Sequence, residues 1–562
     1  MMRVPGEDML MTEAQRRSHE VPRARRGTVR TFGLFVALCI AGGAALAAPV
    51  DTGTLNRIAD AGFNHGEVVE TSAYLADQIG GRLTNSPAMR TAQRWTQGKF
   101  KDWGLKNVHT EAFDFGRGWW IESAHVRLVA PRPMELRSIP IAWTPGTNGP
   151  LTAPIIVAPM RTEKDFDTWK GKLAGKIVLL TWPEPPKDTA PPTFKRLSEL
   201  DVRNLDVYEE PGFDPEALQK RVERQLLRVK IDAFLAREGA VAWAQMSRSE
   251  GRIVHGEGYS YRVGATPKLP GVELGAEDYR RLTRLAKVGE VRVEIDSRVH
   301  FEDADHNGYN IFAELPGKES RAGFVMAGAH LDSWVAGDGA ADNGAGSAIV
   351  MESARILASL AVQPKRTIRF ALWSGEEQGL LGSGAYIAQH LAKRPAPSDP
   401  EVAALGPYFS IETYPVQALP GYKELVGYFN VDNGSGRFRG IYAEGNFAVL
   451  PLFREWLAPF ESLGAASVAA EPTVATDHEL MSRIGVPAFQ FIQDPLDYES
   501  RVHHTDLDTF DHLRPDDMRQ AAVILATVLL DAANSEAPLP GKPLPTQPRL
   551  TDPFHYPEPS KP

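Results

Sequence analysis

The sequence predicts an α/β protein in which a mostly parallel central sheet is flanked by helices and interrupted by an inserted β-rich module. Three observations lead to this prediction. From Asn310 onward, short apolar runs alternate with helical patterns, as in parallel sheets covered on both faces. Residues 125–295 consist instead of short alternating segments separated by Pro and Gly. At 562 residues, the chain exceeds the size at which one core stops growing, so two domains are expected.

The residues before the insert are predicted to be helical. Apolar positions from Val68 to Ile79 recur at spacings of three and four until Gly80 and Gly81 end the pattern, and a second helix is expected over 87–103. Within the insert, a charged helix is expected over 215–237, as a solvated face, a cover for a cleft or part of a dimer interface. The expected strands of the insert are 125–129, 153–157, 176–182 and 291–295.

Strands and helices alternate beyond the insert. Helices are expected at 343–360 and 515–533, and a Pro-rich tail follows them. The expected strands are 324–328, 367–373, 428–431 and 488–492. The predicted divisions are a signal peptide at 1–47, a main domain at 48–124 and 296–535, the insert at 125–295 and a tail at 536–562.

The N-terminus and the charge narrow the classes of protein that the chain can belong to. Arginines precede an apolar run at 32–45 and a small-x-small site at Ala45–Ala47, which predicts export to the periplasm or the medium. A retained membrane anchor is the alternative, but the run is shorter than the roughly 20 residues that span a bilayer. With a net charge of -9 and scattered Lys and Arg, no nucleic-acid partner is expected.

The cysteine content restricts any metal chemistry. Cys39 is the only cysteine, and it lies inside the predicted signal peptide. The mature chain would therefore hold a metal through imidazoles and carboxylates, which favours zinc, manganese or cobalt over iron–sulfur chemistry.

Polar side chains follow the predicted strands of the main domain at their carboxyl ends. The loops that leave this edge of an open α/β sheet converge on a crevice, so one shared site is expected. Two zinc ions about 3.5–4 Å apart need one bridging carboxylate and a terminal pair of ligands each. The predicted metal ligands are His330 and Asp432 for the first zinc, Glu377 and His504 for the second, and Asp342 between them.

Three further residues receive separate roles. Neighbouring glutamates cannot easily direct both carboxylates at one metal, so Glu376 is predicted to be the general base that takes a proton from the attacking water. Asp332 is expected to accept a hydrogen bond from the other ring nitrogen of His330, and His503 is a candidate donor to the oxyanion. Asp477 either lines the cleft or caps the next helix, and Arg501 could bind a substrate carboxylate.

Several motifs together resemble the M28 family of zinc peptidases, most of all its plasma glutamate carboxypeptidase subgroup. They are HLD (330–332), GAADNGAG (339–346), SGEEQGLLGS (374–383), NVD (430–432), TDH (476–478) and HHTDLDT (503–509). The resemblance implies two zinc ions on the residues named above, with His504 as the last ligand. It also implies a protease-associated domain in the insert, a cis peptide bond after Asp342 and a homodimer. Many relatives have Tyr where this chain has His503.

Exopeptidase action on short peptides or dipeptides is the function that the sequence favours. Aminopeptidase, carboxypeptidase and dipeptidase action are not distinguished. Two alternatives stay open, a single-zinc acyl or cyclase-type enzyme of the same fold and a receptor-like binding protein without catalysis. The second alternative would be expected to have lost metal ligands, whereas this chain keeps all five and the base.

Overall fold

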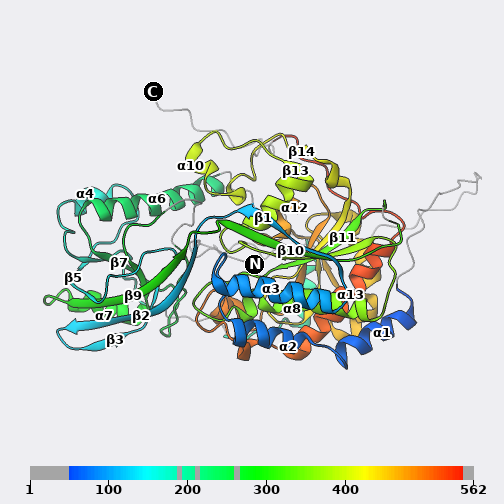
Figure 1. Ribbon diagram of the computed structural model, residues 1–562, viewed down its shortest axis with the longest axis horizontal. Helices are drawn as coiled ribbons and strands as arrows, with labels where there is room; N and C mark the ends of the chain where they lie inside the picture. Colours follow the sequence, from blue (N-terminus) through cyan, green and yellow to red (C-terminus); the bar gives the residue numbers. More distant parts are fainter. Residues whose placement is uncertain (1–49, 187–192, 209–215, 259–265, 320, 548–562) are drawn as a thin grey trace, which may run out of the picture.

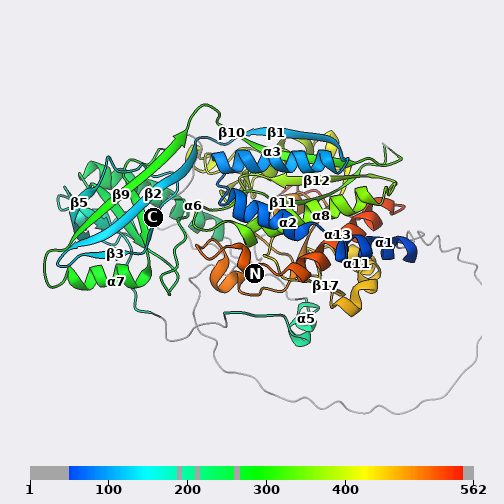
Figure 2. The ribbon, with the colours of Figure 1, turned by 60° about the horizontal axis from the view of Figure 1, so that its bottom comes forward.

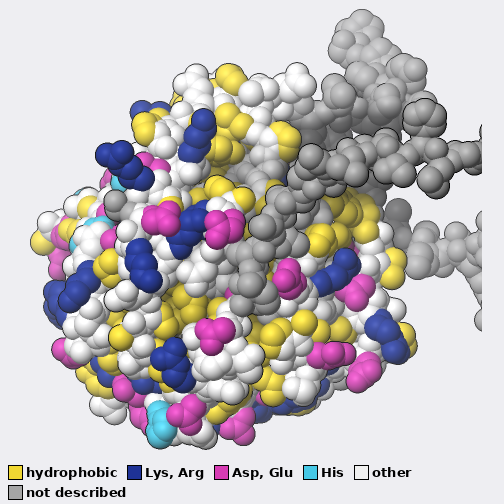
Figure 3. All heavy atoms as spheres, turned by 90° about the vertical axis from the view of Figure 1, so that its right-hand side faces the viewer, with side chains coloured by type: hydrophobic (Ala, Val, Ile, Leu, Met, Phe, Trp, Pro, Cys, Tyr) yellow, Lys and Arg dark blue, Asp and Glu magenta, His cyan; other side chains and the backbone are white. Residues whose placement is uncertain are grey.

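The computed structural model describes residues 50–186, 193–208, 216–258, 266–319 and 321–547. The predicted signal peptide, with Cys39, and the end of the Pro-rich tail lie outside these residues. Figure 1 shows a larger lobe built on a helix-covered sheet and a smaller lobe built on a second sheet. Within the described ranges, no helix combines the length and the apolar character that a membrane span requires. On the face in Figure 3, Lys and Arg side chains are interspersed with Asp and Glu.

The larger lobe contains an eight-stranded sheet with a parallel centre, in the order β1-β10-β12-β11-β15-β18-β16-β17. The four central strands run parallel, and antiparallel pairs flank them on both sides. This arrangement confirms the predicted fold class. The strands are β1 (Lys106–Asp114), β10 (Asn307–Leu315), β11 (Phe324–His330), β12 (Thr367–Trp373), β15 (Leu425–Asn430), β16 (Phe438–Tyr442), β17 (Ser467–Ala469) and β18 (Ala488–Gln493).

Helices cover this sheet and form the main core with it. Helix α8 packs against both α13 and β11, and residues 345–357 of α8 are all buried. Figure 1 shows α3, α8 and α13 on one side of the sheet and α12 on the other. The helices of this lobe are α1 (Thr52–Phe63), α2 (Val68–Ala73), α3 (Pro87–Asp102), α8 (Ala345–Ser359), α9 (Leu381–Tyr386), α10 (Pro400–Ala403), α11 (Leu450–Leu457), α12 (His478–Ser482) and α13 (Pro515–Asn534).

The smaller lobe is the insert, and its sheet has the order β3-β2-β9-β5-β6-β7-β8-β4. Its longest pair, β2 and β9, runs from Gly118 opposite Glu302 to Ala130 opposite Arg292, so the sheet extends beyond the expected limits of 125 and 295. The elements are β2 (Gly118–Ala130), β3 (Met134–Leu136), β4 (Ser138–Pro140), β5 (Leu151–Val157), α4 (Asp165–Trp169), β6 (Ile177–Leu179), α6 (Ala217–Arg237), β7 (Ala242–Met246), β8 (Gly271–Leu274), α7 (Ala276–Leu285) and β9 (Arg292–Glu302).

One segment of the insert lies on the larger lobe. Helix α5 (Glu199–Leu205) packs against β17, and Figure 2 shows it apart from the rest of the smaller lobe. Arg196, just before this helix, pairs with the buried carboxylates of Asp494 at 2.9 Å and Asp517 at 2.7 Å. The two lobes are therefore joined by more than the strands that connect them.

Candidate metal centre

The predicted site residues gather at the carboxyl edge of the central parallel strands. His330 is the last residue of β11, Glu376 and Glu377 follow β12, and Asp432 follows β15. Asp342 lies in the short helical segment η2 (Ala340–Gly344), which leads into α8. Parallel strands end at the same edge, and this brings residues from distant parts of the chain together.

His330, Asp342 and Asp432 form a first group that could hold a cation. The Nε2 atom of His330 lies 3.4 Å from Oδ1 of Asp342 and 3.4 Å from Oδ1 of Asp432. All three side chains are at least nine-tenths buried, and this Nε2 forms no well-aligned hydrogen bond among the described residues. A buried polar atom without a partner is costly, so the group is arranged to bind something.

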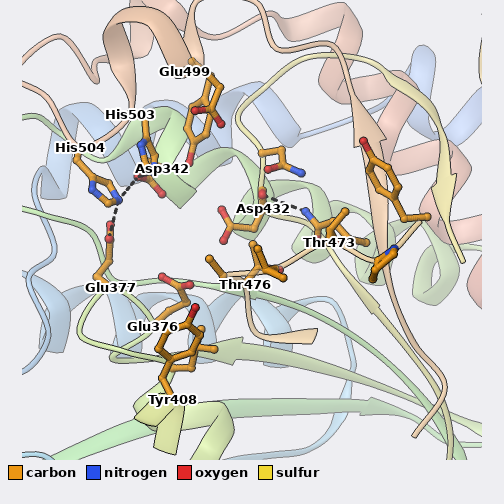
Figure 4. A pocket seen from close by; sticks show the side chains of 18 of the residues that line it. Asp342, Glu376, Glu377, Tyr408, Asp432, Thr473, Thr476, Glu499, His503 and His504 are labelled. Carbon is orange, nitrogen blue, oxygen red and sulfur yellow. Dashed lines mark hydrogen bonds and ion pairs between the residues drawn. The ribbon is translucent and has the colours of Figure 1, made fainter. Parts of the chain in front are cut away.

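A second group shares Asp342 with the first. Its other oxygen, Oδ2, lies 3.2 Å from Nε2 of His504, which is itself 3.0 Å from Oε2 of Glu377. Figure 4 shows Asp342 between these residues and Asp432. Because its two oxygens face different histidines, Asp342 has the geometry of a bridging ligand. Nε2 of His503 lies 3.7 Å from the same Oδ2, so His503 is a further candidate ligand on this side.

The carboxylates of the centre are crowded enough to perturb their protonation. Burial raises the pKa of Glu376 well above its ordinary value, and Asp432 raises it further, against the opposing effect of His330. Burial and the nearby Asp342 raise the pKa of Glu377 to about 8. Bound cations would relieve this repulsion, since carboxylates so close together cannot all stay ionised without positive charge.

The pKa values of His503 and His504 shift in opposite directions. Burial acts to lower the pKa of His504, but Glu377, Glu257 and Asp342 outweigh it, and the pKa rises well above its ordinary value. Burial and the neighbouring His504 instead lower the pKa of His503 to about 3. His503 is therefore a neutral imidazole at neutral pH, which can either donate a hydrogen bond or ligate a metal.

Asp332 supports the centre by a different contact from the expected one. Nδ1 of His330 lies 2.9 Å from the backbone carbonyl oxygen of Asp332, whereas the carboxylate is 3.8 Å away. The carboxylate accepts a hydrogen bond from Thr84 and faces the backbone nitrogens of Glu376 and Glu377 at 3.3 and 3.4 Å. It therefore holds the loop that carries both glutamates.

The sequence analysis did not predict a role for two supporting residues. Asp508 accepts hydrogen bonds from the backbone nitrogens of Ala341 at 2.6 Å and Asp342 at 3.0 Å, and so fixes the bridging carboxylate from behind. Glu257, in the insert, lies 2.6 Å from Nδ1 of His504. Asp508 at least stands in the HHTDLDT motif, whereas Glu257 lies in no motif and only the fold brings it here.

Comparison with known proteins identifies the family. The model of Peptidase family M28 matches residues 310–529. Residues 310–529 belong to peptidase family M28. This confirms the family that the motifs resemble and the prediction of a peptidase. The peptide bond between Asp342 and Asn343 is cis, as the resemblance to M28 implies.

Relatives extend the likeness beyond the M28 region. Carboxypeptidase Q from Bos taurus is 27% identical over 477 residues, which cover 84% of this chain and 86% of that protein. Leupeptin-inactivating enzyme 1 from Streptomyces exfoliatus is 42% identical over 87 residues, which cover 16% of this chain and 20% of the enzyme.

Solved structures share the fold. The M28 peptidase precursor from Shewanella amazonensis SB2B has a TM-score of 0.60 at 24% identity and covers 88% of this chain and 98% of its own. BSAP, a zinc aminopeptidase from Bacillus subtilis, has a TM-score of 0.54 at 20% identity and covers 84% of this chain and 95% of its own.

A cavity of about 470 Å³ opens over the candidate metal centre. Apolar and aromatic side chains line much of it, and two acidic residues besides the predicted metal ligands and the predicted base, Glu471 and Glu499, also line it. None of its described lining residues is Lys or Arg, and Arg501 is exposed and lies outside the lining. The lining side chains beyond the metal centre include Leu205, Leu380, Tyr408, Tyr442, Val474 and Thr476.

The structure corrects the expectation for Asp477 and shows where the charged helix of the insert lies. Asp477 is fully buried, is not among the cavity-lining residues, and makes no capping hydrogen bond to α12, so neither suggested role is observed. Helix α6 buries Ile231, Phe234 and Leu235 in the core of the smaller lobe and exposes charged residues on its other face. The guanidinium of its Arg221 lies 4.7 Å from the ring centre of the cavity-lining Tyr408.

Proposed function

We propose that this protein is a dinuclear zinc exopeptidase that hydrolyses short peptides. The observation that supports this most directly is the orientation of the Asp342 carboxylate, whose Oδ1 faces His330 while its Oδ2 faces His504. Nitrogen and carboxylate ligands suit zinc, and BSAP, which shares the fold, is a zinc enzyme. His330 and Asp432 would hold the first zinc, and Glu377 and His504 the second, with Asp342 shared. When bound, the two ions would lower the pKa of water and stabilise the oxyanion of the tetrahedral intermediate.

Glu376 is the general base of this proposal. It lines the cavity, and its Oε2 lies 3.9 Å from Nε2 of His330, on the side of the first metal position. From there it can accept the proton of the attacking water and return it to the nitrogen of the leaving amine. The neutral ring of His503 can donate a hydrogen bond to the oxyanion, in the position where many relatives carry Tyr.

The cavity favours the amino end of a peptide. A substrate carboxylate would meet Glu471 and Glu499, with no Lys or Arg among the described lining residues, whereas a free ammonium group could pair with either glutamate. The apolar and aromatic lining would accept an apolar first side chain. We therefore infer aminopeptidase action, although some relatives are named carboxypeptidases.

Three further parts of the proposal rest on the sequence and the resemblance. A signal peptide at 1–47 would direct export to the periplasm or the medium. The insert would be a protease-associated domain. The active form would be a homodimer without a stable membrane anchor.

The test uses purified enzyme with its zinc content measured by elemental analysis. We expect two zinc ions per chain, cleavage of C-terminally amidated dipeptides and no cleavage of N-acetylated ones. The reverse preference would overturn the aminopeptidase assignment. One ion per chain would favour the single-zinc cyclase-type alternative, and a zinc-loaded protein that cleaves no peptide would favour a binding protein.

A further inference from the structure

A loop of the insert reaches the second metal position. After β7 the chain runs through residues 247–258 toward the larger lobe, and Oε1 of Glu257 lies 2.6 Å from Nδ1 of His504. The ring of His504 therefore spans the two lobes, with Nε2 facing Asp342 and Glu377 and Nδ1 facing the insert. A histidine that ligates through one nitrogen needs a partner on the other, which fixes the tautomer and the ring orientation.

The loop is anchored inside the insert. The His255 ring is 1% exposed, and its Nδ1 lies 2.8 Å from Oε1 of Glu273, which also accepts a hydrogen bond from the His255 backbone at 2.9 Å. Its Nε2 lies 3.2 Å from Oγ of Ser249, at the start of the same loop. These contacts fix the backbone two residues before Glu257.

The loop is also anchored on the larger lobe. The backbone nitrogen of Val254 donates to Oδ1 of Asp506 at 3.0 Å, and the backbone nitrogen of Asp506 donates to the carbonyl oxygen of Val254 at 3.0 Å. Asp506 follows His504 by two residues, so this contact aligns the two segments that carry Glu257 and His504. Arg137, also in the insert, forms an ion pair with Asp506.

The backbone of His504 shows that its placement depends on its surroundings. Its φ is +61°, in the left-handed region that non-glycine residues seldom adopt. Such a conformation persists where neighbouring contacts determine it. Its side chain makes polar contacts with Glu377 and Asp342 on one side and with Glu257 on the other, and its ring also lies beside those of His503 and Trp334.

We propose that Glu257 is a positioning residue for the second zinc ion, acting through His504, so that the insert is a structural part of the metal centre. The inference rests on the proposed function. The carboxylate holds Nδ1 of His504 protonated and directs Nε2 toward Asp342 and Glu377. Removal of such a partner typically lowers metal affinity 10- to 100-fold. Docking of the insert and occupancy of the second position are therefore linked.

The test compares Glu257→Ala and Glu257→Gln with the control Glu294→Gln. Glu294 is also in the insert and pairs with Arg127 at 2.7 Å, on the surface of the smaller lobe. Zinc binding to the folded, chelator-treated protein is measured by competition titration, and the visible spectrum of the cobalt-substituted protein reports the ligand set of each position. We expect Glu257→Ala to keep the first ion and bind the second about 10- to 100-fold more weakly. Glu257→Gln, which keeps an acceptor without the charge, should lie between Glu257→Ala and the wild type.

The outcomes separate this inference from the proposed function. If the wild-type protein binds two zinc ions and Glu257→Ala binds both with unchanged affinity, Glu257 has no positioning role while the dinuclear site stands. Equal weakening of both ions would also overturn the inference, because it would indicate a general loss of structure. A wild-type protein that binds no zinc would overturn the proposed function itself.

Discussion

The two proposed metal positions differ in how the fold builds them. The first takes His330 and Asp432 from the ends of adjacent central strands, and a backbone carbonyl of the same lobe holds the second nitrogen of His330. The second takes Glu377 and His504 from loops, and a side chain of the other lobe holds His504, which is 19% exposed. The first position is thus preorganised by the sheet, whereas the second depends on how the two lobes dock.

The largest expected effect concerns Glu376, the proposed base, which belongs to neither set of metal ligands. Glu376→Gln should lower kcat by roughly 10³-fold, because it removes the proton acceptor while keeping the shape of the side chain. Its zinc content should stay at two ions per chain, because Glu376 is not in the proposed ligand set. Steady-state kinetics together with elemental analysis check both parts. Unchanged turnover in this variant would refute the assignment of the base.

The next prediction asks whether His503 belongs to the second position as a ligand or as a donor. His503→Phe should lower kcat by about 10²-fold through loss of a hydrogen bond to the oxyanion. His503→Tyr, which restores a donor, should recover much of the activity. Both variants should keep two zinc ions. A fall to one ion in His503→Phe would instead make His503 a metal ligand.

The difference in preorganisation predicts that zinc leaves in two stages. Titration of the wild-type protein with a chelator should remove the second ion at about tenfold lower chelator strength than the first, since preorganised sites lose less entropy on binding. His504→Gln lacks a ligand of the second position, so this variant should show only the release of the more tightly bound first ion. Zinc content at each chelator concentration gives the result, and simultaneous loss of both ions would contradict the distinction between the positions.

The last prediction is a pH dependence of the stability of the chelator-treated protein. Glu377 has an ordinary pKa of 4.5, and burial raises its pKa to about 8 in the fold. Between these values the unfolded chain ionises while the folded protein keeps the proton, so stability should fall as pH rises from about 4.5 to about 8. Glu377→Gln should flatten this slope, by up to roughly 1.4 kcal/mol per pH unit. Urea unfolding from pH 5 to pH 8 measures it, with Glu294→Gln as the control. If Glu377→Gln showed the same slope as the wild type, the raised pKa of Glu377 would be contradicted.

The elements with strong local patterns were predicted well from the sequence. The strand expected at 367–373 matches β12, and the helix expected at 515–533 matches α13 within one residue. The helical pattern expected from Val68 to Ile79 is found as α2 followed directly by the π-helical turn η1 (Tyr74–Ile79), which ends at Gly80 as expected. Strands β2 and β9 extend beyond the expected limits of the insert, 125 and 295, as one long pair.

The sequence by itself determined the set of ligand types and the edge of the sheet where they gather, because apolar strands followed by His, Asp and Glu are visible as local patterns. Only the tertiary structure decided which atoms face each other. In the fold, the two oxygens of Asp342 face different histidines, and the Asp332 carboxylate contacts the backbone of the loop that carries Glu376 and Glu377. Glu257 contacts His504, which lies 247 residues further along the chain. Contacts between segments so far apart depend on how the lobes dock, and no local pattern of residues records that geometry.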